Sequence, residues 1–212
     1  MRSRRRLLQD QRLYLIVNIT GRQRPSPAEL RRVIRGGADM IQLRSKALSD
    51  KAFLEYALRL KALCKACGVI FIINDRADIA LACKADGLHI GQDDIEPSVA
   101  RRLLGRNKII GLSAHSIAQA RRAARDRSLD YIGLGPIFKT TTKPGARPIG
   151  MGTIRRVTRI KGMLPLFVIG GINIGNIKKV IAQGAKAIAV SGAVFSSKQP
   201  SGVVRRLKKD LE

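Results

Sequence analysis

The feature that most constrains the fold is a regular alternation of short β-branched runs with longer helical segments, repeated eight times along the chain. Segments such as 27–35, 50–65 and 174–183 carry apolar residues at helical spacing, which predicts helices between strands. Strand–helix alternation favours a parallel α/β sheet. The eight predicted strands are residues 13–18, 40–44, 69–73, 87–90, 109–113, 131–134, 166–169 and 187–190.

Eight such units in 212 residues favour a closed (β/α)8 TIM barrel, with a doubly wound open sheet as the alternative. We predict a single domain over residues 13–212, because 45% hydrophobic residues can build one large core. Residues 1–12 form a basic N-terminal extension that we expect to be solvated, since Gln9, Asp10 and Arg12 interrupt the apolar run of a secretory signal. We therefore expect a cytoplasmic protein.

Membrane insertion and disulfide bonding are not expected from the sequence. No run of 18 or more apolar residues is present, so we expect no membrane association. The three cysteines do not form a disulfide framework, and we interpret Cys64 and Cys67 as structural or incidental thiols.

The net charge of +26 raises the question of nucleic-acid binding. The arginine pairs, however, recur once per predicted helix, which spreads the charge around the molecule. Aromatic residues make up only 4% of the chain and tryptophan is absent, which leaves few platforms for base stacking. We expect no specific nucleic-acid partner, although general attraction to polyanions follows from the charge.

Polar residues follow several predicted strands, at the end where TIM barrels carry their active sites. Gln42, Arg44 and Lys46 alternate, so their side chains share one face of an extended strand and offer donors to phosphate oxygens. Asn74 and Asp75 follow the third strand, and Ser113 ends the fifth.

Acidic residues are concentrated in the same part of the chain. Asp75 and Asp94 are the predicted ligands of a hard cation, most naturally Mg²⁺, which takes one or two carboxylates together with substrate phosphates. Asp93 is interpreted as the cap of a short helix. Six of the fifteen acidic residues lie in this stretch: Asp75, Asp78, Asp86, Asp93, Asp94 and Glu96.

The later loops add candidate phosphate contacts. Residues 135–150 form a long polar loop that we interpret as a binding lid, with hydroxyls from Thr140 and Thr142 and a charge from Lys143. Gly170-Gly171 and Ser191-Gly192 follow the last two strands, where barrels often hold a phosphate on backbone N–H groups. His89 and His115, the only histidines, are assigned structural or substrate-edge roles.

Taken in order, these segments resemble the thiamine phosphate synthase family. The similarity extends over nearly all of the chain from the first strand to the last. The motifs are Gln42-Leu-Arg-Ser-Lys46, Ile73-Asn-Asp75, Asp86-Gly-Leu-His-Ile-Gly-Gln-Asp-Asp94, Gly111-Leu-Ser-Ala-His115, Gly133-Leu-Gly-Pro-Ile-Phe138, Thr140-Thr-Thr-Lys143 and Ile169-Gly-Gly-Ile172.

The resemblance implies a TIM-barrel transferase of an alkyl group, which joins a pyrimidine diphosphate to a thiazole phosphate with Mg²⁺ as cofactor. It implies small-molecule partners and leaves a homo-oligomer open. The metal ligands would be Asp75 and Asp94, with Arg44, Lys46 and Lys143 acting electrostatically. The pyrimidine diphosphate would contact Gln42, Leu43, Arg44, Ser45, Lys46, Asn74, Ser113 and Lys143, and the thiazole phosphate Thr140, Thr141, Thr142, Gly171, Ser191 and Gly192.

The sequence departs from the family pattern in three respects, one of which is a net charge of +26, more positive than expected for the family. Lys139 stands where the family usually has proline, and Ser191-Gly192 replaces the more usual aliphatic-Ser pair. Two other functions are alternatives. A related thiazole tautomerase would bind only the thiazole phosphate, which the presence of Arg44, Lys46 and Asp75 argues against. A binding protein without turnover, holding nucleic acid on its basic exterior, is the other alternative.

Overall fold

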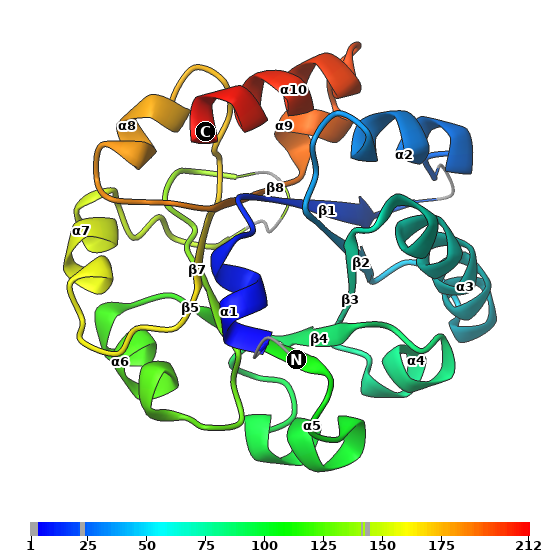
Figure 1. Cartoon of the computed structure of the whole chain (residues 1–212), viewed down its shortest axis with the longest axis horizontal. Coiled ribbons are helices and arrows are strands. Elements are labelled where there is room, and N and C mark those ends of the chain that lie inside the picture. Colours follow the sequence, from blue (N-terminus) through cyan, green and yellow to red (C-terminus); the bar gives the residue numbers. More distant parts are fainter. Residues whose placement is uncertain (1–3, 22–23, 141, 143–144) are drawn as a thin grey trace.

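The computed structural model, which describes residues 4–21, 24–140, 142 and 145–212, is a closed barrel of parallel strands in sequential order, with helices around it (Figure 1). The strands are β1 (Leu13–Ile19), β2 (Met40–Ser45), β3 (Ile70–Asn74), β4 (Gly87–Ile90), β5 (Ile109–Ala114), β6 (Tyr131–Leu134), β7 (Leu166–Ile169) and β8 (Ile188–Val190). The pairing of β1 with β8 closes the sheet, which confirms the TIM barrel and excludes the doubly wound alternative.

The helices follow the strands in turn. α2 (Pro27–Ile34) begins with a capping box in which Ser26 and Glu29 satisfy each other's backbone N–H groups. α3 (Asp50–Cys67) begins at the Ser49 cap and ends at Gly68, whose φ of 70° closes the helix. The others are α4 (Ala77–Ala82), α5 (Pro97–Leu104), α6 (Ile117–Arg125), α7 (Gly152–Thr158), α8 (Ile177–Ile181), α9 (Gly192–Phe195) and α10 (Pro200–Leu211).

α8 is shorter than the predicted helix over residues 174–183. The difference lies in two asparagines that use their side chains on the backbone. Asn173 accepts a hydrogen bond from the N–H of Gly175 at 2.8 Å, and Asn176 accepts one from the N–H of Asn173 at 2.9 Å. Such local bonds compete with the helical pattern and delay the start of the helix.

Two separate cores follow from the alternation of side chains along the strands. One set fills the space between the barrel and its helices, for example Leu15, Leu43 and Phe71. The other set fills the barrel interior and includes Tyr14, Met40, Ile72, Ile109, Tyr131 and Phe167.

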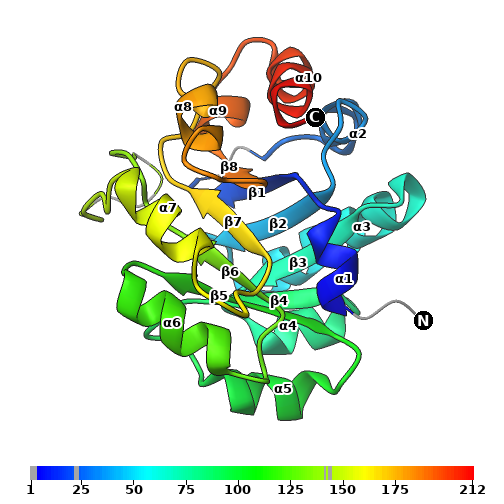
Figure 2. The same cartoon turned by 60° about the vertical axis from the view of Figure 1, so that its left-hand side comes forward.

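α1 (Arg4–Gln9) lies across the amino-terminal end of the barrel (Figures 1 and 2). Leu8 is only 1% exposed and belongs to the interior core. Arg4 contacts the carboxylate of Asp130 at 2.9 Å, and Arg5 donates to the carbonyl of Leu129 at 2.9 Å. The expectation that this segment is solvated is therefore wrong for Leu8, whereas Arg5 and Arg6 are exposed.

Three aspartates at the same end connect neighbouring strands. Each directly precedes an even-numbered strand, and its carboxylate accepts a backbone hydrogen bond at or near the start of the strand before it. Asp130 is the most buried of them, at 2% exposed, and it also binds Arg101 at 2.6 Å. The backbone bonds are Leu13 N to Asp39 (2.8 Å), Phe71 N to Asp86 (2.8 Å) and Ile110 N to Asp130 (2.9 Å).

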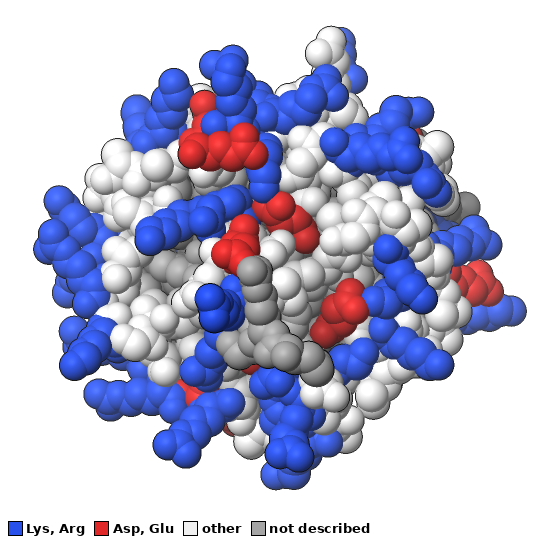
Figure 3. Space-filling view, in the orientation of Figure 1, with Lys and Arg blue, Asp and Glu red and all other residues white. Residues whose placement is uncertain are grey.

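Basic side chains are widely spread over the visible face of the molecule in Figure 3. On the face shown in Figure 3, Lys and Arg lie around the full circumference instead of in one stripe. No helix in the described part of the chain is long and apolar enough to cross a membrane.

Candidate active site

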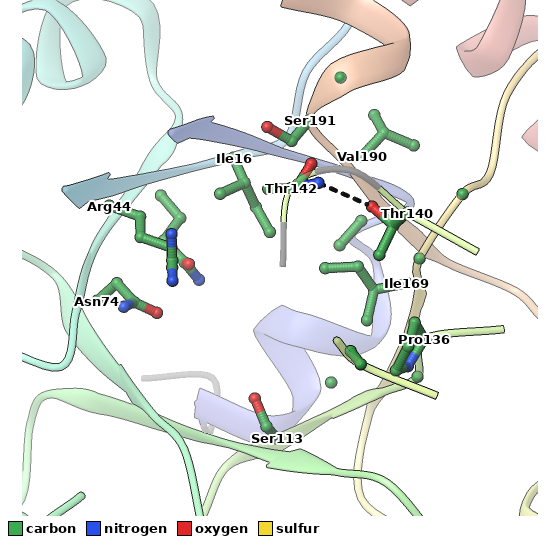
Figure 4. Close-up of a pocket in the computed structure, with 18 of the residues that line it drawn as sticks. Ile16, Arg44, Asn74, Ser113, Pro136, Thr140, Thr142, Ile169, Val190 and Ser191 are labelled. Atoms are coloured by element: carbon green, nitrogen blue, oxygen red, sulfur yellow. Dashed lines mark hydrogen bonds between the residues drawn. The ribbon is translucent and has the colours of Figure 1, made fainter. Parts of the chain in front are cut away.

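A pocket of about 750 Å³ opens at the carboxyl ends of the strands. Figure 4 shows Arg44 and Asn74 on one side of it, Thr140 and Ile169 on the opposite side, and Ser191 above. Residues from several βα loops therefore converge on one space, as predicted for this end of a barrel. The predicted site residues that line it are Gln42, Arg44, Lys46, Asn74, Asp75, Asp94, Ser113, Thr140, Thr142, Gly171, Ser191 and Gly192.

The alternation predicted for the second strand is confirmed. Gln42, Arg44 and Lys46 line the pocket, whereas the side chain of Leu43 is fully buried in the layer between the barrel and the helices. Ser45 points away as well, because its hydroxyl donates to the carbonyl of Ile19 at 3.1 Å. Leu43 and Ser45 are thus not among the lining residues.

Arg44 is held in place by its neighbour on β1. Its Nη1 donates to the Asn18 side-chain oxygen at 2.6 Å. The guanidinium keeps further donors for an anion in the pocket, since it carries five N–H groups in all.

Asp75 is positioned by an unusual backbone. Its φ of 62° lies in the left-handed region, which an aspartate adopts at some cost and which is frequent at functional sites. Its N–H donates to the carbonyl of His89 at 2.9 Å, and its carboxylate binds Lys46 Nζ at 2.7 Å. The backbone thus turns the carboxylate toward the pocket immediately after β3.

Asp94 faces the same point as Asp75, and the two carboxylates affect each other. Burial raises the pKa of Asp75, and the nearby Asp94 raises it further, against the opposing effect of Lys46. Burial acts to raise the pKa of Asp94 too, but the hydrogen bond from Gly91 N–H at 2.7 Å and the contact with Asp75 bring it below its usual value. A cation between the carboxylates would favour ionisation of both.

The larger acidic cluster suggested by the sequence does not form. Asp86 lies before β4, at the opposite end of the barrel, where it binds Lys61 at 2.5 Å. Asp78 binds Arg76 instead of facing the pocket. Asp93 lines the pocket, and Glu96, not Asp93, stands at the start of α5. Among the described residues, no group of three or more His, Cys, Asp or Glu side chains is arranged to hold a metal ion.

The opposite side of the pocket is shaped by close backbone approach. A Cβ at Gly170 would lie 2.4 Å from Pro136, and one at Gly171 would lie 2.6 Å from the Lys139 carbonyl. Both residues also have positive φ. These glycines therefore let the loop after β6 pack against the end of β7, which places Thr140 and Thr142 at the pocket.

Ser191 and Gly192 complete this side at the first turn of α9. The first N–H groups of a helix have no partner within it, so backbone donors are available there. Thr142 N–H donates to Thr140 Oγ1 at 3.3 Å, drawn as a dashed line in Figure 4. The predicted contacts of Thr141 and Lys143 fall outside the described residues.

Several lining residues were not assigned to ligands from the sequence. Gln92 follows β4 and donates to the Ser113 carbonyl at 2.7 Å, and His115 Nδ1 lies 2.5 Å from the Gly135 carbonyl oxygen. Asn173 and Lys139 also line the pocket. Their position after a strand was the available signal, but a single polar residue there is equally typical of a turn.

The closed barrel, with a pocket lined by polar side chains at the carboxyl ends of its strands, belongs to the TIM-barrel class, whose enzymes carry their active sites at this end. A solved structure, the thiamine phosphate pyrophosphorylase from Pyrococcus furiosus, is 33% identical, covers 97% of each chain and has a TM-score of 0.85. The thiamine-phosphate synthase of Chloroflexus aurantiacus is 44% identical over 94% of this chain and 92% of its own length. The thiamine-phosphate synthase of Prochlorococcus marinus MIT 9313 is 41% identical over 99% of this chain, which spans only 60% of that longer protein.

The family model described as thiamine monophosphate synthase matches residues 13–194. The chain belongs to the thiamine monophosphate synthase family, a family of transferase enzymes, as the resemblance predicted.

Proposed function

We propose that this chain is a thiamine phosphate synthase, which condenses 4-amino-2-methyl-5-(diphosphooxymethyl)pyrimidine with 4-methyl-5-(2-phosphoethyl)thiazole or its carboxylated form. The supporting observation is that two sets of anion-binding groups face each other across one pocket. Arg44 and Asn74 lie on one side, with Thr140 opposite and Ser191 above, and Lys46 lines the pocket beside Asp75. The first set suits the diphosphate and the second suits the thiazole phosphate.

The reaction needs charge neutralisation more than proton transfer. The bond between the pyrimidine methylene carbon and the diphosphate oxygen breaks, and its electron pair leaves with diphosphate. The thiazole nitrogen then forms the new bond to carbon with its own lone pair. With the carboxylated thiazole, the carboxylate additionally leaves as CO2 and the carbon that bore it takes up a proton. Arg44 and Lys46 would stabilise the negative charge that develops on the leaving group, joined in this proposal by Lys143. The nitrogen loses no proton, so no general base is required.

Mg²⁺ is the cofactor that we propose for this site, held by Asp75 and Asp94. The donor set fits, because two carboxylates meet at the pocket wall beside the groups proposed for the diphosphate. A bound Mg²⁺ would add positive charge at the diphosphate oxygens. Lys46, which binds Asp75 at 2.7 Å, orients that carboxylate in this structure.

The first test is formation of thiamine phosphate from the two purified substrates, followed by chromatography with Mg²⁺ and with excess chelator. We expect product only with the metal. Asp75→Asn should lower kcat by about 100-fold or more, the usual cost of losing a group that stabilises charge in the transition state. Asp78→Asn is the matched control, because Asp78 is near in sequence but binds Arg76.

The outcomes separate the alternatives. Product formed equally well with chelator would contradict the metal site but not the synthase. Absence of product from folded protein, with interconversion of thiazole phosphate tautomers, would favour the tautomerase. Absence of both, with salt-sensitive binding to nucleic acid, would favour the binding protein. A cytoplasmic location and a homo-oligomer stay predictions.

A further inference from the structure

Five side chains form a continuous run of hydrogen bonds through the barrel interior, here called the Gln42–Ser113 chain. Gln42 Nε2 donates to Tyr14 OH at 2.6 Å, and Tyr14 OH lies 3.0 Å from Tyr131 OH. Tyr131 OH lies 2.9 Å from His89 Nδ1, and His89 Nε2 lies 3.0 Å from Ser113 Oγ. The chain therefore connects the pocket wall at β2 with the pocket wall at β5.

The interior is built to hold these rings in one place. A Cβ at Gly111 would lie 2.1 Å from the Tyr131 ring, and a Cβ at Gly133 would lie 3.2 Å from His89 Cε1. The absence of side chains at these two positions gives both rings their space. Phe167 packs edge-on against the rings of Tyr14 and Tyr131, with centroids 5.3 and 5.4 Å away.

Only one assignment of donors and acceptors along the Gln42–Ser113 chain lets every N–H and O–H between Gln42 and Ser113 donate to the next residue. Because Gln42 donates through its amide nitrogen, the Tyr14 oxygen accepts, and the Tyr14 proton passes to Tyr131. The Tyr131 proton is then directed at His89 Nδ1, which places the His89 proton on Nε2. Burial raises the pKa of both tyrosines, so both phenols keep their protons at neutral pH.

Ser113, at one end of the Gln42–Ser113 chain, faces the pocket. Its oxygen accepts the proton of His89 Nε2, so its own proton is free to be donated to a ligand. A hydroxyl fixed as a donor favours an acceptor such as a phosphate oxygen and disfavours a ligand group that can only donate.

We infer that Tyr14, Tyr131 and His89 are positioning residues. The two tyrosines fix the tautomer of His89, and His89 in turn holds the Ser113 hydroxyl as a donor to an acceptor atom of the pyrimidine diphosphate. This inference rests on the proposed function for the identity of the ligand. The direction of the hydrogen bonds does not depend on it.

Tyr131→Phe tests the chain, because it removes one hydroxyl and keeps the ring that packs against Phe167. We expect His89 in the wild type to carry its proton on Nε2 at pH 8, and the variant to lose this preference. The ¹⁵N NMR shifts of the imidazole nitrogens report the tautomer, and assignment is simple because the protein has only two histidines. Tyr56→Phe is the matched control, since Tyr56 OH donates to the Pro25 carbonyl at 2.8 Å, away from the pocket.

Kinetics give the second readout. Tyr131→Phe should raise the KM for the pyrimidine diphosphate about 5- to 10-fold, a factor that corresponds to the net contribution of about one hydrogen bond to binding. The KM for the thiazole phosphate should stay unchanged. In a Ser113→Ala background, Tyr131→Phe should have no further effect on the KM for the pyrimidine diphosphate. The Ser113 hydroxyl through which Tyr131 acts is then already absent. A purely structural role for Tyr131 would instead add its effect to that of Ser113→Ala.

The inference is overturned if His89 in the wild type carries its proton on Nδ1, or if Tyr131→Phe changes neither the tautomer nor the KM. If the wild type makes no thiamine phosphate, the proposed function fails. The tautomer measurement then still decides whether the Gln42–Ser113 chain has the inferred direction.

Discussion

Arg44 shows how a single residue combines position and chemistry in this pocket. Its place on β2 makes it face the pocket, and the 2.6 Å bond to Asn18 fixes its guanidinium before any ligand binds. A side chain that is already ordered loses less conformational freedom on binding. Both the charge and the planar shape of Arg44 are therefore expected to matter.

Arg44→Lys keeps the charge and removes the planar fork. We expect kcat/KM to fall about 10-fold or more, because a hydrogen bond to a charged group contributes about 1.5–3 kcal/mol. Steady-state kinetics with both substrates measure the change. Arg59→Lys, on the exposed face of α3, is the control and should behave as the wild type. Equal activity in both variants would show that the fork is not used.

At the scale of residues, the sequence predicted pocket-lining residues at and after the strand ends. It did not predict the two tyrosines that we propose to act on Ser113 through His89. Gln42, Arg44 and Asp75 were found because polar residues in strand ends stand out against apolar neighbours. Tyr14 and Tyr131 were not, because they sit on β1 and β6 and meet only across the closed barrel. Nothing in the local sequence of either strand indicates that contact.

At the scale of elements, α1 closes the barrel with one side chain. Leu8 lies in the interior core at 1% exposed, whereas its neighbour Leu7 is 40% exposed. The sequence did not indicate this, because one apolar turn in a basic segment gives too little periodicity to define a buried face.

Leu8→Ala should lower the free energy of unfolding by about 3 kcal/mol, the usual cost of a cavity left by a buried leucine. Urea denaturation followed by circular dichroism measures this difference. Leu7→Ala serves as the matched control and should change the stability far less. If both variants are equally stable, α1 does not contribute to the core in solution.

The position of β4 also explains why the predicted acidic cluster was too large. Asp86 and Asp94 are close in sequence, but one precedes β4 and the other follows it, so the strand separates them. The strands themselves were predicted almost to the residue, with β3 and β8 each starting one residue later than expected. The predicted bounds of β4 already placed Asp86 before the strand and Asp94 after it, so the cluster was overestimated because closeness in sequence was counted without regard to the two ends of the strand.

The whole molecule carries a formal charge of +26, and Figure 3 shows basic side chains around its circumference. Charges of one sign repel each other over about 30 Å at 0.01 M salt and over much shorter distances at high salt. The folded state, being compact, suffers more from this repulsion than the unfolded chain. Salt should therefore stabilise the protein.

We expect the Tm to rise by several degrees when NaCl increases from about 0.01 M to about 0.5 M, as repulsion is screened. Differential scanning calorimetry gives the shift. A variant with Arg122→Gln, Arg156→Gln and Arg205→Gln, all exposed on different helices, should show a smaller rise. A Tm that falls with salt would mean that the ion pairs outweigh the repulsion.

The closure of the barrel by Leu8 has a consequence for the order of events in a reaction cycle. With the amino-terminal end filled, the substrates and products of the proposed reaction would share the opening at the carboxyl ends of the strands. A product that has not yet departed occupies the route of the next substrate. In the proposed reaction, the pocket must therefore empty before it can take up the next pair of substrates.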